Sequence, residues 1–150
     1  MSVLKSKRTE SKAQFVTTAN NIFGETMRFA TRLSNRYSFL RDNVMALAGE
    51  VVDHAEKANK VFPSDDVRKQ RREAHLLEAL SSLSALDVKL AWVYSVLTKN
   101  PQGCFEKTNG DSLPPDRARE RLNKMSESLG CLIDEENALL TKVLKSDKER

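Results

Sequence analysis

The sequence predicts an all-α protein, an antiparallel up-and-down four-helix bundle with a long third helix. Apolar residues recur at spacings of three and four along four separate segments, which is the pattern of a helix with one buried face. The chain of 150 residues holds only five glycines and four prolines, and it shows almost no strand pattern. The first two links are short, so neighbouring helices are expected to run in opposite directions.

The first two helices are expected at 11–34 and 37–61. Their apolar stripes are Phe15, Ala19, Ile22, Thr26, Phe29 and Leu33 in the first helix, and Leu40, Val44, Leu47, Val51, Ala55 and Ala58 in the second. The joint between the two helices lies near Ser34-Asn35-Arg36, and the second helix ends before Phe62-Pro63.

The third helix is expected at 64–99 and carries the most regular stripe. Its seam alternates at spacings of three and four as the a and d positions of heptads do, through Leu76, Ala79, Leu83, Leu86, Leu90, Val93 and Leu97. Ser64 is a plausible N-cap, with Asp65 and Asp66 in the positive first turn, and Pro101 stops the helix. A helix of about 50 Å cannot be stable alone in water, so it needs partner helices along its whole seam.

The fourth helix is expected at 114–146, with Ala118, Leu122, Met125, Leu129, Leu132, Leu139 and Val143 on its apolar stripe. An irregular loop at about 100–113, rich in turn-forming residues, precedes it as an excursion or small hairpin. We therefore expect a basic, flexible N-terminus at 1–10 and one bundle domain at 11–150. Two cysteines, no signal segment and no long apolar span predict a cytoplasmic protein with no membrane contact.

Basic residues are distributed unevenly in this chain of net charge +4. The chain begins with a basic group of Lys5, Lys7, Arg8 and Lys12, which is followed by a predicted ridge of Arg28, Arg32, Arg36 and Arg41. A second cluster consists of Arg68, Lys69, Arg71 and Arg72, and a third consists of Arg117, Arg119, Arg121 and Lys124. Each cluster has two interpretations, a solvated helix face or a surface for phosphate. The guanidinium group of arginine forks onto phosphate or carboxylate, which favours a nucleic acid or an acidic protein groove.

Catalytic, metal and cofactor sites are not predicted. His54 and His75 lie on different expected helices, and neither has the glutamate three residues earlier that a di-iron bundle needs. His54 with Asp53 and Glu50 has two interpretations, an acid-base or metal set, or a partly exposed histidine beside carboxylates, and the second is the more common case. We expect no enzyme activity.

Two carboxylates fall within apolar stretches and are predicted to be structural. Asp87 lies between Leu86 and Val88, and Glu136 lies at a seam position of the fourth helix. A carboxylate in such a place needs a partner. We therefore predict a buried or interfacial ion pair for Asp87. For Glu136 we predict an ion pair, a polar group that fixes the register of the packed helices, or a polar contact between subunits.

The order of the helices and three sequence segments resemble a known group of proteins. The segments are LSNRYSFL, which leads into the second helix, AEKANKVFPSDDVRKQRREAHLLEALSSLSALDVKLAWVY, which runs through the third, and LGCLIDEENALLTKVLKSDKER, which closes the chain. The chain resembles the small four-helix-bundle proteins of the 23S ribosomal RNA intervening-sequence group. Within that group it is most similar to the accessory variability determinant proteins of diversity-generating retroelements, over about 11–150. The similar segments hold no catalytic signature.

The resemblance implies a non-enzymatic accessory protein. Such proteins are homopentamers with a positive surface that bind a reverse transcriptase and its template RNA or cDNA and support mutagenic cDNA synthesis. Apolar residues off the main seam likewise predict self-association, and the resemblance implies a ring of five; these residues are Phe23, Trp92, Tyr94 and Val96. The alternative is a structural or interaction bundle of the intervening-sequence group that does not bind nucleic acid strongly.

Overall fold

The computed structural model describes residues 13–101 and 113–149, and all regular secondary structure within these residues is helical. The four α-helices are α2 (Gln14–Ala30), α3 (Ser38–Lys60), α4 (Asp66–Thr98) and α5 (Pro115–Lys148), and a 3-10 helix, η1 (Asn35–Tyr37), joins α2 to α3. Each helix begins and ends within four residues of its predicted bounds. The predicted N-terminus at 1–10 and most of the predicted loop at 100–113 lie outside the described residues.

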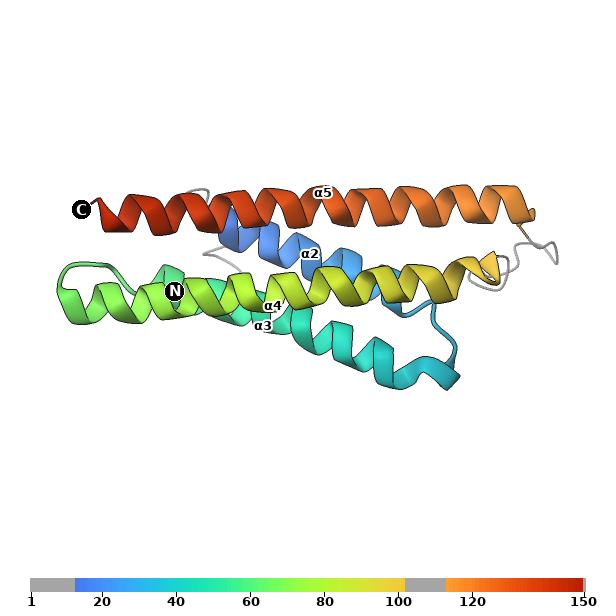
Figure 1. Ribbon diagram of the computed structural model, residues 1–150, viewed down its shortest axis with the longest axis horizontal. Helices are drawn as coiled ribbons and strands as arrows, with labels where there is room; N and C mark the ends of the chain where they lie inside the picture. Colours follow the sequence, from blue (N-terminus) through green and yellow to red (C-terminus); the bar gives the residue numbers. More distant parts are fainter. Residues whose placement is uncertain (1–12, 102–112, 150) are drawn as a thin grey trace, which may run out of the picture.

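The helices pack as a bundle around one core. The main contacts join α2 with α3, α3 with α4, α4 with α5 and α5 with α2, so this is the order of the helices around the core. Figure 1 shows the two longest helices, α4 and α5, side by side along the length of the molecule. Within the described ranges, no helix is long and apolar enough to cross a membrane.

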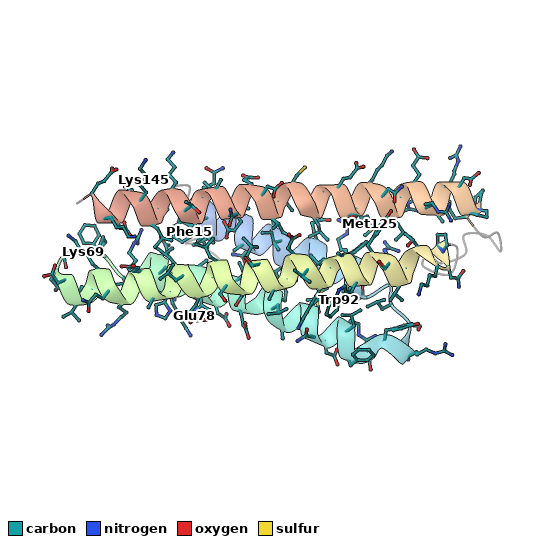
Figure 2. The ribbon with its side chains drawn as sticks, in the orientation of Figure 1. Phe15, Lys69, Glu78, Trp92, Met125 and Lys145 are labelled. Atoms are coloured by element: carbon teal, nitrogen blue, oxygen red, sulfur yellow. The ribbon has the colours of Figure 1, made fainter. Side chains whose placement is uncertain are left out.

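The core confirms the predicted stripes of α2 and α4. All seven predicted seam residues of α4 are buried, from Leu76 to Leu97. All six predicted positions from Phe15 to Leu33 are buried as well, although Leu33 lies just beyond the end of α2. Figure 2 shows the contrast between Phe15, which lies between helices, and Lys145, which points away from the bundle on α5.

The stripe of α5 differs from the prediction in its second half. Ile133, Glu136 and Leu140 are buried, whereas the predicted Leu132, Leu139 and Val143 are only partly buried. A straight α-helix turns once every 3.6 residues, so a pattern read at strict heptad spacing drifts by about 20° per heptad. The buried positions of α5 therefore fall one residue later than predicted at Ile133 and Leu140, whereas Glu136 is buried at its predicted seam position. A smaller correction applies to α3, where Ala48 is buried and Leu47 is partly buried.

The first helix ends earlier than predicted, at Ala30 instead of residue 34. The amides of Arg32 and Leu33 donate to carbonyl oxygens three residues back, at 3.3 and 3.1 Å, which tightens the chain out of the α-helix. Ser34 then adopts an extended backbone with φ −68° and ψ 161°, which ends the helical path. This early end changes the placement of the predicted arginine ridge.

Candidate nucleic-acid interface

The predicted ridge of Arg28, Arg32, Arg36 and Arg41 is divided among four pieces of backbone. Arg28 lies in the last turn of α2, Arg32 in the turn that follows, Arg36 in η1 and Arg41 in α3. The regular spacing of four residues therefore does not produce one helical row of side chains. The side chain of Arg28 is 71% exposed and lies 3.6 Å from Glu25, and Arg41 contacts Asp42 at 3.6 Å and Asn35 at 3.4 Å.

Two of these arginines meet a lysine from another helix. Arg32 and Arg36 line a hollow of about 250 Å³ together with Lys99, which follows the end of α4. Ser34, Tyr37 and Asn100 add polar groups to its lining, and Leu33, Val96 and Leu97 add apolar ones. None of the described residues that line this hollow is acidic. We call it the basic hollow, and its three cations and hydroxyl groups suit a phosphate ligand.

Lys99 was not among the predicted binding residues. In sequence it is a single lysine at a helix end, and it lies 67 positions beyond Arg32. No local pattern relates the two residues. The packing of α4 against the segment that joins α2 to α3 creates the cluster.

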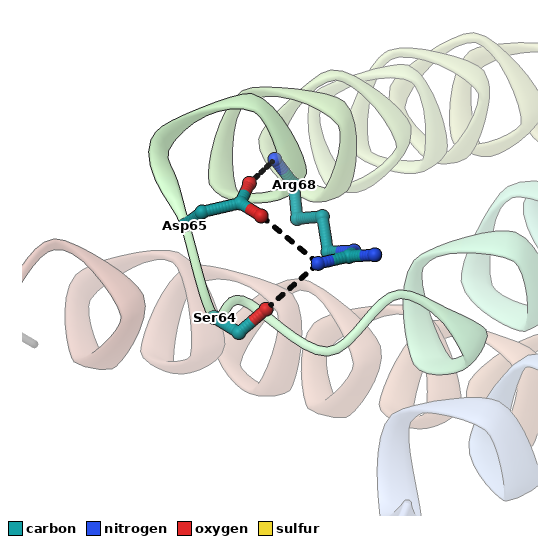
Figure 3. A network of polar contacts seen from close by, with 3 residues as sticks. All are labelled: Ser64, Asp65 and Arg68. Atoms are coloured by element: carbon teal, nitrogen blue, oxygen red, sulfur yellow. Dashed lines mark hydrogen bonds and ion pairs between the residues drawn. The ribbon is translucent and has the colours of Figure 1, made fainter.

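In the second predicted cluster, Arg68 takes part in capping α4. The carboxylate of Asp65 accepts a hydrogen bond from the Arg68 amide at 2.8 Å, so Asp65 is the N-cap and the predicted cap at Ser64 is wrong. The Arg68 guanidinium donates to the other oxygen of Asp65 at 2.9 Å and to the Ser64 hydroxyl at 3.2 Å (Figure 3). The Arg68 charge is thus compensated within the chain, although its side chain remains 57% exposed.

Arg72 of the same cluster is largely buried and makes contacts within the chain. Its Nε donates to Asp147 near the end of α5 at 2.6 Å, and both side chains are only 13% exposed. A terminal nitrogen of Arg72 also donates to the carbonyl oxygens of Ala58 and Val61 at 3.1 and 3.3 Å. One guanidinium therefore joins α4, α5 and the end of α3. The contacts of Arg72 within the chain are therefore structural, whereas Arg71 is exposed and Lys69 is partly exposed.

The two predicted structural carboxylates behave differently from one another. Asp87 is exposed, because it lies one position, or about 100° of helix, beyond the buried Leu86. Glu136 is fully buried, as its seam position predicted, but neither of its carboxylate oxygens has a hydrogen-bond partner. The ion pairs predicted for the two residues are not found in the part of the chain that the structure describes.

Burial dominates the electrostatics of Glu136. Transfer of a carboxylate out of water without a partner favours its neutral form. Burial therefore raises the pKa of Glu136 from 4.5 to about 8, and the nearby Glu135 carboxylate adds to the rise. Glu136 is consequently protonated at neutral pH, which makes it a neutral polar group inside the core.

His54 and His75, which lie on different helices, form a pair that the sequence did not predict. Their Nδ1 atoms are 3.2 Å apart, so one ring donates an N–H hydrogen bond to the other. Burial and the neighbouring His54, Lys57 and Arg71 lower the pKa of His75, while Glu78 opposes them. The pair thus links α3 and α4.

No group of three or more histidine, cysteine, aspartate or glutamate residues able to hold a metal ion occurs within residues 13–101 and 113–149.

Comparison with known proteins adds no family to this description. No protein-family model, no curated protein and no solved structure matches the chain.

Proposed function

We propose that this chain is a non-enzymatic, cytoplasmic accessory protein of a diversity-generating retroelement. It binds the reverse transcriptase and the template RNA or cDNA and supports mutagenic cDNA synthesis. The proposal has its origin in the resemblance of the sequence segments. The structural observation that supports nucleic-acid binding is the basic hollow, where Arg32, Arg36 and Lys99 lie together without a carboxylate in the lining.

The basic hollow suits a phosphate backbone better than a sequence-specific base contact. Binding through phosphates is mostly electrostatic, tolerates changes of base sequence and weakens steeply with salt. Neighbouring cations extend the surface, because Arg28, whose side chain is 71% exposed, and Arg41, whose side chain is 26% exposed, lie in the elements on either side of the hollow. This makes the hollow the centre of the proposed interface.

We further propose an antiparallel up-and-down arrangement of the helices. The side-chain contacts support it, because the early residue Arg72 of α4 pairs with the late residue Asp147 of α5, and Tyr94 of α4 donates to Asn123 of α5. His54 of α3 likewise contacts His75 of α4, and Glu50 accepts from Ser82. In both helix pairs, earlier residues of one helix contact later residues of the other.

A homopentamer completes the proposal. Of the four residues predicted to lie in an interface, Trp92 is 55% exposed, whereas Phe23, Tyr94 and Val96 are partly buried against the core of the chain itself. Leu77 and Val88 are also at least half exposed on α4 and join Trp92 as candidate interface residues. Light scattering should give five times the chain mass at micromolar concentration, and a monomer would reject self-association.

The nucleic-acid proposal is tested by removal of two charges from the basic hollow. The double variant Arg36→Gln/Lys99→Gln changes two exposed side chains. Single-stranded RNA should bind it more weakly than the parent, and the slope of log affinity against log salt should flatten by about 0.7 for each phosphate that the variant no longer neutralises. Filter binding or fluorescence anisotropy at several salt concentrations measures both quantities.

The matched control is Lys142→Gln/Lys145→Gln, which removes the same charge from exposed positions near the end of α5. It should retain the parent affinity and slope within experimental error. Equal reductions of affinity in the two double variants would mean that binding depends on net charge alone, and the hollow would then not be the binding site.

The second candidate function is an interaction bundle that does not bind nucleic acid strongly. It is favoured by Arg68 and Arg72, because both predicted binding residues are used in contacts within the chain. Absence of measurable RNA and DNA binding by the parent at low salt would select this function. A reverse transcriptase gene with variable and template repeats beside the gene for this chain would select the first.

A further inference from the structure

A groove between α4 and α5 is separate from the basic hollow. It has a volume of about 210 Å³, and its apolar wall is formed by Phe29 of α2, Leu90 of α4, and Leu129 and Ile133 of α5. Asp87 and Gly130 also line it, from facing helices. The four apolar residues belong to the core, so the groove is an opening through which solvent reaches the edge of the core.

Gly130 keeps this groove open. A Cβ atom built at Gly130 meets no atom of another residue within 4 Å, so the packing of the chain does not require glycine there. Glycine within a helix is less favourable than alanine by about 1 kcal/mol. The residue thus weakens α5 locally and leaves an unfilled space opposite Asp87.

The charge at the mouth of the groove is negative in a chain of net charge +4. Asp87 is the only aspartate, glutamate, lysine or arginine among the lining residues. Glu127 and Asp134 lie about one turn before and after Gly130 on α5, and both are exposed. None of these three carboxylates forms an ion pair with another described residue.

Size and charge together select the ligand class. Sites for drug-sized ligands and cofactors measure about 300–1,000 Å³, which exceeds this groove. The negative mouth repels phosphate, so an RNA or DNA backbone does not fit. An apolar wall beside a carboxylate matches a long side chain whose methylene stem is buried while its charged end stays at the surface.

We propose that the groove binds a lysine side chain of a partner protein. The aliphatic stem lies along Leu90, Leu129 and Ile133, and the ammonium group pairs with the Asp87 carboxylate, with Glu127 and Asp134 adding a favourable field. The proposal does not depend on nucleic-acid binding, because it uses a different surface of opposite charge. It also explains why an exposed aspartate interrupts the apolar sequence around Leu86 and Leu90.

The test uses two peptides that differ only in the charged end. Acetyl-Ala-Lys-Ala-amide is titrated into the ¹⁵N-labelled full chain, in parallel with the same peptide containing norleucine in place of lysine. The lysine peptide should shift the amide signals of Asp87, Ala91 and Gly130 and bind at least threefold more tightly than the norleucine peptide. Equal affinity of the two peptides, or shifts centred on another surface, would overturn the proposal.

Two variants separate the contribution of the Asp87 charge to peptide binding from that of the space in the groove. Asp87→Asn should bring the affinity for the lysine peptide down to that for the norleucine peptide, while leaving the latter unchanged. Gly130→Leu should abolish binding of both peptides because its side chain fills the groove. Retention of the lysine preference in Asp87→Asn would exclude the carboxylate as the acceptor.

A third variant guards against misfolding. Gly130→Ala adds one methyl group to open space, so it should raise the melting temperature and still bind the lysine peptide. If Gly130→Leu does not fold, Asp87→Asn still decides the question, because it is a conservative change at an exposed position.

Discussion

Two carboxylates on α5, Asp147 and Glu136, show what a partner does for a group withdrawn from water. Asp147 accepts from Arg72 at 2.6 Å and is 13% exposed, whereas Glu136 is fully buried and neither oxygen is hydrogen-bonded. The first carboxylate joins two helices as an ion pair. The second stays protonated and neutral at pH 7, since burial raises the pKa of Glu136 to about 8.

Burial alone does not make a carboxylate a structural contact. The Arg72 guanidinium supplies hydrogen bonds to Asp147 and to two carbonyl oxygens at once, so its removal leaves several groups without their donor. Nothing among the described residues depends on the charge of Glu136. The two sites should therefore respond in opposite directions when each is neutralised.

Arg72→Ala should produce the largest effect on stability. The change leaves Asp147 charged and unpaired and removes the donor from the carbonyl oxygens of Ala58 and Val61. Loss of one partner of a buried pair costs about 3–5 kcal/mol. Urea unfolding followed by circular dichroism measures the free energy of unfolding. The exposed neighbour Arg71→Ala is the control and should change it by about 0.5 kcal/mol or less.

Glu136→Gln should stabilise the protein at neutral pH. The folded state keeps a proton on Glu136 up to about pH 8, whereas the unfolded state loses it near pH 4.5, so the stability of the parent falls as pH rises through this window. Each pH unit of this window costs about 1.4 kcal/mol. The variant lacks this dependence and should gain about 3 kcal/mol over the parent at pH 7.

The pH dependence itself provides the check. At pH 4.5 the parent and Glu136→Gln should have nearly equal urea midpoints, and the difference should grow with pH. The control Glu135→Gln changes only the minor, exposed contributor and should follow the parent closely. A Glu136→Gln variant that is less stable than the parent at pH 8 would show that the carboxylate has a partner.

The His54–His75 pair should show the smallest effect and the opposite sign. Because the folded-state pKa of His75 is lowered from 6.5, the unfolded state binds a proton more readily as pH falls through that value, and stability decreases. Double protonation would also place an N–H on both facing atoms and break the hydrogen bond. His75→Gln should therefore lose less stability than the parent between pH 7.5 and 5.5, as measured by urea midpoints.

Local pattern was sufficient to predict the helices and much of the core. The spacing of three and four from Leu76 to Leu97 placed every core residue of the α4 seam, because a helix that packs on one side buries one angular sector whatever its partner is. The end of α3 before Phe62-Pro63 was likewise predicted correctly. The prediction failed for Leu132, Leu139 and Val143 of α5, where a heptad pattern and a straight helix diverge.

The pattern of residues along the chain specifies which segments are helical, where most of them end and which face of each is apolar, because these properties depend on residues within a few turns of one another. The packing of the helices specifies which polar residues meet. It brought Arg32 and Arg36 to Lys99, Arg72 to Asp147, and Asp87 to the open space at Gly130, and it left Glu136 without a partner. The physical reason is that a charge acts on whatever lies within a few ångströms, and that neighbour depends on how the helices pack against one another.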